Sequence, residues 1–403
     1  MTLARAEIVV DLAAIRHNVR TLQQTTGVEV IVVVKADGYG HGMAQVAGAA
    51  RAAGATWLAV ATPDEALALR AVGDTGRLLC WLTVPGEPYA DAIAAGIDLT
   101  AYSVAELDEI AAAAESVEHP VGNPVGHPDG HLARVQLKVD TGLSRGGAPR
   151  EAWAELFARA RAGEEAGHWL ITGVWSHLAC SDEPEHPAND HQEQAFRDAL
   201  SLADEAGLRP GLRHLANSAA AILRPSARFD AVRCGIASYG LDPAPGHTPD
   251  LGLVPAMTVR ARLALVKTLA AGDSVSYGHT WTAQAPTTVG LVPAGYGEGV
   301  PRHASGVASV GVAGIQRPIR GRVCMDQFLV DLGPEDDSTP HAGDEVLLLG
   351  PGRHGEPTAQ DWAEACDTIS YEIVTRIGGR MTRTHVDSDT EKTHDTASQD
   401  ESR

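Results

Sequence analysis

The sequence has few lysines for its length. Lysine occurs only at Lys35, Lys138, Lys267 and Lys392 among 403 residues, so arginine fills nearly every other basic position. Arginine stays protonated in proteins, whereas a lysine amine can lose its proton and attack a carbonyl to form a Schiff base. The lysines that remain are therefore candidates for chemistry, except Lys392, which stands in a polar tail.

Cysteines are also few, and they exclude two classes of protein. The five are scattered and form no C-x-x-C: Cys80, Cys180, Cys234, Cys324 and Cys366. An odd and scattered set suits reduced, buried thiols better than a disulfide framework or a zinc knuckle. We therefore expect a protein of a reducing compartment.

Long apolar runs and excess positive charge are absent as well. No window approaches the roughly 18 uninterrupted apolar residues of a membrane span. Acidic residues outnumber basic ones 52 to 32, and a net charge of −20 repels nucleic-acid phosphates. The first 20 residues lack the apolar core of a signal peptide. We expect a cytoplasmic protein that binds neither nucleic acid nor membrane.

From residue 11 to about 240, helical patterns alternate with short apolar runs. Asp11, Thr62 and Ser103 each begin a helix: a proline and two first-turn acids follow Thr62, and Ser103 forms a capping box with Glu106. Eight strands are expected: Val28–Val34, Trp57–Val60, Arg77–Leu82, Ile97–Ala101, Leu132–Val139, Leu170–Trp175, Leu212–Leu215 and Asp230–Arg233. This alternation predicts an α/β fold, a (β/α)8 TIM-like barrel whose reactive groups follow the carboxyl ends of the strands.

Beyond residue 240 the pattern changes to short apolar runs separated by glycine and proline, with hardly a helical stretch. The runs are Thr258–Val266, Thr288–Val292, Val307–Val312, Phe328–Leu332 and Glu345–Leu349. They predict a mostly β domain made of residues 1–10 and 241–383, after the barrel at 11–240. Residues 384–403 are expected to form a disordered acidic tail. The segment 119–131 is a His-, Pro- and Gly-rich insertion without a metal-binding motif, so we expect no metal site.

Lys35 stands where barrel chemistry is expected, at the end of the apolar strand in VEVIVVVKADGYGHG. Partial desolvation at that position lowers the pKa of an amine towards the neutral form that imine formation requires. By the same strand count, several other residues should face this mouth: Trp81, Lys138, Arg145, His177, Asn217, Ser218, Arg233, Gly235 and Ile236. We expect Trp81 to pack beside a bound ring.

The loops after strands seven and eight form the usual phosphate site of this fold. Ser218, with the backbone amides near Gly235 and Ile236, offers several hydrogen-bond donors without a basic side chain. The glycines after Lys35 do not match the strand-turn-helix fingerprint of nicotinamide binding. A lysine together with a phosphate site predicts pyridoxal phosphate as the cofactor.

Eight segments resemble, in order and spacing, the motifs of the alanine racemase family across about residues 5 to 380. They are VVVKADGYGHG, KVDTGLSRGG, SHLACSD, HLANSAA, VRCGIASYG, VSYGHTW, PAGYGEG and VCMDQ. The resemblance implies a homodimer of barrel and β domain in which the partner's β domain completes each active site. It also implies interconversion of L- and D-alanine, which supplies D-alanine for peptidoglycan.

The resemblance implies roles for named residues. Lys35 is the base at one face of the substrate's Cα and the lysine bound to pyridoxal phosphate, and Tyr277 of the other subunit is the base at the opposite face. The phosphate neighbours are Tyr39, Ser218, Gly235, Ile236 and Tyr371. Arg233 is the partner of the pyridine nitrogen, Arg145 of the phenolic oxygen and the substrate carboxylate, and His177 works with Tyr277. Lys138 resembles a lysine that is carbamylated in several members of the family. Tyr296 and Met325 line the entrance for the substrate.

The chemistry of these roles follows independent rules. Racemisation removes a proton from one face of a planar carbon and delivers one to the other, so two bases are the simplest arrangement. A tyrosine with a reference pKa of about 10 needs help to ionise at neutral pH. Arginine does not give up its proton, so beside Arg233 a pyridine nitrogen stays unprotonated, which favours reprotonation of Cα over transamination.

Three alternatives remain at this stage. A barrel-type pyridoxal-phosphate decarboxylase shares the barrel, the lysine and the β domain, but we expect it to carry an acid in place of Arg233. A non-enzymatic pyridoxal-phosphate carrier has no use for residues 241–380. A broad-spectrum or serine racemase differs only in the size of its pocket. The chain also has Gly297-Glu298 where the family commonly has Ala-Asp.

Overall fold

The computed structural model describes residues 4–117 and 132–388. The insertion at 119–131 and the tail beyond residue 388 lie outside these residues. Within the described ranges, no helix combines the length and the apolar character that crossing a membrane requires. All five cysteines fall inside these ranges and are free thiols.

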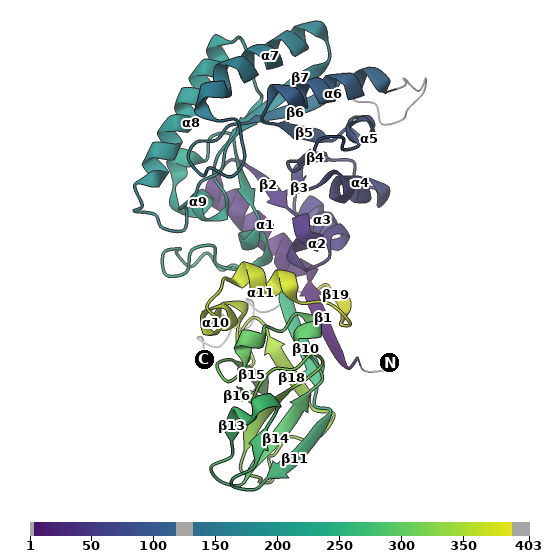
Figure 1. The fold of residues 1–403 in the computed structure, drawn as a ribbon, viewed down its shortest axis with the longest axis vertical. Coiled ribbons are helices and arrows are strands. Elements are labelled where there is room, and N and C mark those ends of the chain that lie inside the picture. Colours follow the sequence, from purple (N-terminus) through teal and green to yellow (C-terminus); the bar gives the residue numbers. More distant parts are fainter. Residues whose placement is uncertain (1–3, 118–131, 389–403) are drawn as a thin grey trace, which may run out of the picture.

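Eight parallel strands form the upper body of the molecule in Figure 1, in the order β8-β7-β6-β5-β4-β3-β2-β9. Their bounds are β2 Glu29–Val33, β3 Trp57–Val60, β4 Arg77–Cys80, β5 Asp98–Ala101, β6 Ala133–Lys138, β7 Trp169–Trp175, β8 Leu212–His214 and β9 Ala231–Cys234. The Asp230 amide donates to the Arg213 carbonyl at 3.0 Å, and the Arg233 amide to that of Ala216 at 2.9 Å. These bonds join β8 to β9, so the sheet is nearly closed, and the predicted (β/α)8 barrel is confirmed.

Helices alternate with these strands and cover the outside of the barrel (Figure 1). They are α1 Leu12–Thr26, α3 Met43–Ala52, α4 Pro63–Ala71, α5 Tyr89–Ala94, α6 Val104–Ser116, α7 Trp153–Ala166, α8 Ala188–Glu205 and α9 Ser218–Leu223. The short segment α2 Lys35–Tyr39 lies instead at the carboxyl end of the barrel, after β2. The predicted caps are present, because Asp11 accepts from the Ala13 amide at 2.9 Å and Ser103 from the Glu106 amide at 3.1 Å. Thr62 and Glu65 form a capping box at the start of α4.

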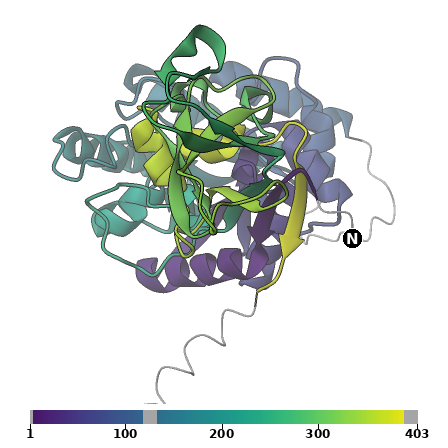
Figure 2. The same ribbon diagram turned by 90° about the horizontal axis from the view of Figure 1, so that it is seen from below.

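The lower body is a nine-stranded sheet in the order β11-β14-β17-β16-β15-β18-β10-β1-β19. Its strands are β1 Ala6–Asp11, β10 Met257–Arg262, β11 Leu265–Leu269, β14 Thr287–Val292, β15 Ser309–Val312, β16 Ile315–Arg320, β17 Phe328–Gly333, β18 Glu345–Leu349 and β19 Thr382–Val386, with a separate hairpin of β12 Ser274–Val275 and β13 Trp281–Thr282. Strand β1 pairs in parallel with β19 and antiparallel with β10. Figures 1 and 2 show these first and last strands side by side. We call this body the β domain.

Three expectations for the β domain need correction. Thr258–Val266 is not one strand, because the Leu263 amide bonds to Asp344 and the Ala264 amide to Leu291, which turns the chain from β10 into β11. Two short helices were missed, α10 Ala359–Ala365 and α11 Ser370–Arg376, since each is too short to show a helical period. Strand β19 runs to Val386, so the tail does not begin at 384; backbone pairing with β1 orders this polar segment.

Candidate active site

The carboxyl ends of the barrel strands open into a cavity of about 790 Å³. Candidate residues from seven segments far apart in the chain line it: Lys35, Tyr39, Trp81, Lys138, Arg145, His177, Asn217, Ser218, Arg233, Gly235, Ile236 and Tyr371. Tyr371 comes from α11, which lies between the barrel and the β domain in Figure 1. We call this cavity the barrel mouth.

Three sequence-predicted residues do not line the barrel mouth of their own chain. Tyr277 is 73% exposed, Met325 is 55% exposed and Tyr296 is 43% exposed. In the β domain, Tyr277 and Tyr296 begin short 3-10 helices and Met325 lies on a loop. The chain folds these side chains outward rather than towards its own Lys35. A single copy of the chain therefore has only part of the predicted constellation in one place.

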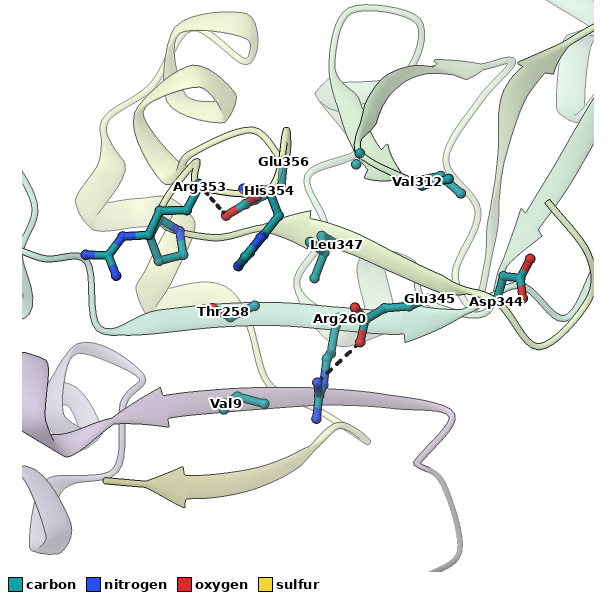
Figure 3. A pocket seen from close by; sticks show the side chains of 14 residues that line it. Val9, Thr258, Arg260, Val312, Asp344, Glu345, Leu347, Arg353, His354 and Glu356 are labelled. Carbon is teal, nitrogen blue, oxygen red and sulfur yellow. Dashed lines mark hydrogen bonds and ion pairs between the residues drawn. The ribbon is translucent and has the colours of Figure 1, made fainter. Parts of the chain in front are cut away.

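A second cavity, of about 1000 Å³, lies on the β domain over a face of the neighbouring strands β1, β10, β18 and β15 (Figure 3). Its carboxylates already have partners. Glu345 accepts from Arg260 at 3.2 Å, and Glu356 accepts backbone amides, including that of Arg353 at 3.1 Å. These carboxylates therefore belong to ion pairs and hydrogen bonds at the surface. The reactive residues lie at the barrel mouth instead.

Lys35 follows the end of β2, and Glu65 of α4 anchors the backbone directly after it. The Ala36 amide donates to one oxygen of Glu65 at 2.7 Å, and the Ala61 amide donates to the other at 2.8 Å. Glu65 thus ties the segment after β2 to the segment after β3. Burial, with a smaller effect from Arg145, lowers the pKa of Lys35. The Lys35 Nζ lies 5.7 Å from the centre of the Trp81 ring.

The backbone after Lys35 is left-handed at four successive residues. Ala36, Asp37, Gly38 and Tyr39 have φ between 52° and 62°. Side chains with a Cβ resist this conformation by about 1–2 kcal/mol per residue. Asp37 supports the turn, because its carboxylate accepts from the Met43 amide at 2.9 Å and from Arg383 at 2.6 Å. Such strain beside a reactive side chain is typical of a functional site.

Arg233 is buried at the bottom of the mouth and sits between two histidines. One terminal nitrogen donates to His214 Nδ1 at 2.9 Å, and the other lies 3.1 Å from His177 Nδ1. The carbonyls of Ser176 and Leu215 accept from the second nitrogen at 2.8 and 3.0 Å. Burial lowers the pKa of Arg233 to about 9, so the guanidinium is still charged at neutral pH.

The two histidines beside Arg233 are neutral for the same physical reason. Burial and then the nearby cation Arg233 lower the pKa of both His177 and His214 well below the ordinary value. A neutral imidazole has one N–H and one lone pair, and an arginine can only donate. Each Nδ1 is therefore the acceptor, and each Nε2 carries the proton.

The lining of the barrel mouth is strongly cationic. It includes Lys35, Lys138, Arg145 and Arg233, whereas Glu372, the acid among the described lining residues, bonds to Arg376 at 2.9 Å. Burial, followed by the charges of Arg233 and Arg145, lowers the pKa of Lys138 to about 8. A cavity of this kind is suited to an anionic ligand.

A small cradle of polar groups forms between α9 and the residue after β9. The Gly235 amide donates to the Ser218 hydroxyl at 3.0 Å. A Cβ at Gly235 would overlap the hydroxyl of Tyr39, so only glycine leaves the tyrosine its place. Asn217 caps α9 by accepting from the Ala220 amide at 3.1 Å. Backbone N–H groups at helix starts have no partner within the helix and can bind an anion.

Three residues near the site were missed by sequence reasoning: His214, Gln136 and Trp175. Trp175 packs against two of the cationic side chains, with its ring centre 4.7 Å from Lys138 Nζ and 4.8 Å from Arg233 Cζ. Gln136 Oε1 is 2.7 Å from His214 Nε2. A signal existed for the two polar residues, since a buried parallel strand is normally an apolar run and polar residues within it need partners.

The fold and the barrel mouth define a class, a barrel enzyme that holds an anionic cofactor beside a lysine amine. Family models agree: the alanine racemase N-terminal domain matches residues 10–243, and the C-terminal domain matches 256–385. An alanine racemase from Thermobifida fusca is 52% identical over 94% of this chain and 98% of its own length. One from Streptomyces coelicolor is 50% identical over 95% and 96%.

Solved structures give the same result. The alanine racemase from a D-cycloserine-producing Streptomyces lavendulae has a TM-score of 0.91 and 48% identity, over 98% of this chain and all of the other. One from Bartonella henselae, described with covalently bound pyridoxal phosphate, has a TM-score of 0.82 and 29% identity, over 95% of this chain and all of the other. The chain belongs to the alanine racemase family, the pyridoxal-phosphate-dependent isomerases that interconvert L- and D-alanine.

The residues present suit pyridoxal phosphate. The phosphate is a dianion that the cradle at Ser218 and Gly235 can receive, and the cationic lining compensates its charge. The Trp81 ring stands beside the Lys35 amine, where an aromatic cofactor joined to that amine can pack. Arg233 is a buried guanidinium that lines the cavity, so it can donate to a ring nitrogen there.

Proposed function

We propose that this chain racemises alanine with two bases, Lys35 of one subunit and Tyr277 of the partner subunit, in a homodimer with two shared sites. The observation that carries the proposal is the separation of the bases. Lys35 lines the barrel mouth, whereas Tyr277 points into solvent from the β domain of the same chain. A symmetric dimer that places each β domain over the other barrel would bring the two bases together twice.

Pyridoxal phosphate, when bound, withdraws electrons from the substrate's Cα and makes its proton acidic. We assign its phosphate to Tyr39, Ser218, Gly235, Ile236 and Tyr371, with Asn217 ordering the start of α9. Its ring lies beside Trp81 in this proposal, with Arg233 as the partner of the ring nitrogen. The amine of Lys35, whose pKa is lowered by burial, takes or gives the Cα proton on one face.

His177 supports the base on the other face. Because its Nδ1 accepts from Arg233, its proton is on Nε2. This N–H is available to donate to the phenolic oxygen of Tyr277 of the partner subunit, and such a bond stabilises the ionised form that accepts a proton. Tyr296 and Met325 of the partner subunit line the entrance in this arrangement.

Arg145 binds the substrate carboxylate, and a carbamate on Lys138 would hold Arg145 in place. Four cations with little opposing charge favour an anion in the mouth. The lowered pKa of Lys138 leaves a larger neutral fraction, and only a neutral amine can add CO2 to form a carbamate. The carbamate would turn one of the four cations into an anion beside Arg145. Five free thiols agree with a cytoplasmic location for the enzyme.

Mixing two inactive variants tests the shared site. A heterodimer of Lys35→Ala with Tyr277→Ala has one site without either base and one intact site, so about half of the wild-type activity should return. The control is a heterodimer of wild type with the double variant, in which every shared site lacks one base and activity stays near zero. The reverse pattern, an inactive first heterodimer and an active control, would show that both bases come from one chain.

A substrate panel separates the remaining chemical alternatives. We expect racemisation of L- and D-alanine without release of CO2, because Arg233 rather than an acid stands at the bottom of the mouth. Racemisation of serine at a similar kcat/KM would show a broad-spectrum enzyme. Release of CO2 from any amino acid in place of racemisation would refute the proposed reaction.

A further inference from the structure

Gln136 is a fully buried polar residue in the middle of β6, between Val135 and Leu137. Its Oε1 lies 2.7 Å from Nε2 of His214, which is also fully buried. Gly173 on the neighbouring strand β7 makes room for this amide, since a Cβ there would lie 2.9 Å from Gln136 Cδ. The contact is therefore built into the packing of the barrel interior.

Donor and acceptor rules allow only one arrangement of protons along the chain Gln136, His214, Arg233. The Arg233 guanidinium can only donate, so His214 Nδ1, at 2.9 Å, must offer its lone pair. The proton of a neutral His214 then lies on Nε2, and its partner must be an acceptor. Gln136 supplies that acceptor through Oε1, and the opposite orientation of the amide would place two donors face to face.

Other contacts make this arrangement rigid. The His214 ring stacks on Trp175 at 5.7 Å between centres, with only 8° between the planes. The charged and titratable groups that face the network are Arg233 from β9, Lys138 at the end of β6 and His177 after β7. Burial and the charge of Arg233 disfavour a second cation at His214. An uncharged acceptor at position 136 suits this setting. A carboxylate there would raise the pKa of His214 and so favour a second proton on the ring, at Nδ1.

We propose that Gln136 is a positioning residue for the reaction: it holds His214 with the proton on Nε2 and thereby keeps the Arg233 guanidinium in place at the bottom of the barrel mouth. The proposal rests on the proposed function, in which Arg233 is the partner of the ring nitrogen. Gln136 does not line the cavity. Its effect reaches the reaction only through His214 and Arg233.

The test compares Gln136→Glu and Gln136→Met with wild type in the holoenzyme. A carboxylate at 136 favours a doubly protonated His214, whose Nδ1–H would push Arg233 away. Without that partner the ring nitrogen can be protonated, and more alanine should be converted to pyruvate, with its amino group transferred to the cofactor. We expect the ratio of pyruvate formation to racemisation to rise about tenfold to hundredfold in Gln136→Glu, with a smaller rise in Gln136→Met.

A second measurement does not depend on turnover. The dissociation constant of pyridoxal phosphate from the apoenzyme should rise about tenfold in Gln136→Glu, while the KM for alanine changes little because Arg145 is untouched. The matched control is Asn18→Asp, which also turns a fully buried amide into a carboxylate. Asn18 lies on α1, does not line the mouth, and bonds to the backbone of Val254 and Ser238. It should lower stability without changing the ratio of products.

An unchanged product ratio and an unchanged cofactor affinity in folded Gln136→Glu would overturn the proposal. An equal change in Asn18→Asp would also overturn it, because any buried carboxylate would then suffice. If Gln136→Glu does not fold, Gln136→Met decides by the same two measurements. A wild-type enzyme that does not racemise alanine would refute the proposed function instead, and the cofactor affinities would still test the link from Gln136 to Arg233.

Discussion

In the barrel mouth, the side chains of Lys35, His177 and Arg233 are partly or wholly buried, and hydrogen bonds and ring contacts set their geometry. On the β domain, Tyr277 is 73% exposed and lies outside that cavity. The first region is preorganised within one chain, and the second presents a reactive group to another surface. The difference indicates that one chain is only half of the catalytic unit.

The two regions nevertheless share one feature, a strained backbone beside a reactive residue. The left-handed turn of Ala36 to Tyr39 follows Lys35, and Ser144, with φ of 57°, precedes Arg145. Ser276, with φ of 62° and ψ of −179°, precedes Tyr277. The Ser276 hydroxyl donates to the Arg322 carbonyl at 2.6 Å, which anchors the conformation. In both regions, neighbouring contacts hold a conformation that the backbone alone disfavours.

Of the changes predicted here, removal of Lys35 from the barrel mouth should have the largest effect on activity. Lys35→Ala should lower racemisation by about 10³-fold or more, since it removes a base and the covalent attachment of the cofactor. After borohydride reduction, a peptide mass map should show the cofactor on Lys35 in wild type and on no lysine in the variant. The control is Lys267→Ala, an exposed lysine on β11, which should behave like wild type. A reduced adduct that persists in Lys35→Ala would disprove the assignment.

Substitution of Lys138 should have an intermediate effect on activity, and the carbamate on Lys138 should depend on pH. Its pKa is lowered to about 8, so below pH 8 the neutral amine falls about tenfold per pH unit. Carbamate occupancy, measured by intact mass in bicarbonate, should therefore decrease as pH falls and return as pH rises. Lys138→Arg, which keeps a cation but cannot form a carbamate, should raise the KM for alanine about tenfold. A bare amine at pH 9 in high bicarbonate would contradict this prediction.

Substitution of Ser276 should have the smallest effect on activity. Two variants separate the loss of its hydrogen bond from the relief of backbone strain. Ser276→Ala keeps the strained φ but loses the bond to Arg322, so the free energy of unfolding should fall by about 0.5–1.5 kcal/mol. Ser276→Gly loses the same bond but relieves the strain, and its stability should stay close to that of wild type. Both should lower kcat about threefold to tenfold, because one hydrogen bond no longer orients Tyr277.

Urea unfolding and steady-state kinetics separate these effects. Ser338→Ala is the control, since that exposed serine bonds to Asp336 within a turn of the β domain. Equal stability of the Ala and Gly variants would show that the backbone at Ser276 is not strained. An unchanged kcat in both would show that Ser276 does not position Tyr277.

Local signals explain why so much of the barrel was predictable. The caps at Asp11, Thr62 and Ser103 act within a few residues of the chain, and runs such as Val30–Val33 are buried on both faces of a parallel sheet. The β domain was less predictable. Its short helices α10 and α11 have too few residues for a period, and its sheet joins β1 and β19 from opposite ends of the chain.

The sequence by itself determined the order of the barrel elements, the place of Lys35 at a strand end and the motifs that the family shares, because these depend on neighbouring residues and their spacing. Only the tertiary structure decided that Gln136, His214 and Arg233 form one hydrogen-bonded chain and that Tyr277 points away from its own barrel mouth. Such contacts join residues far apart in sequence. They depend on strand register, on the space that Gly173 leaves and on the packing of two domains, none of which a local pattern encodes.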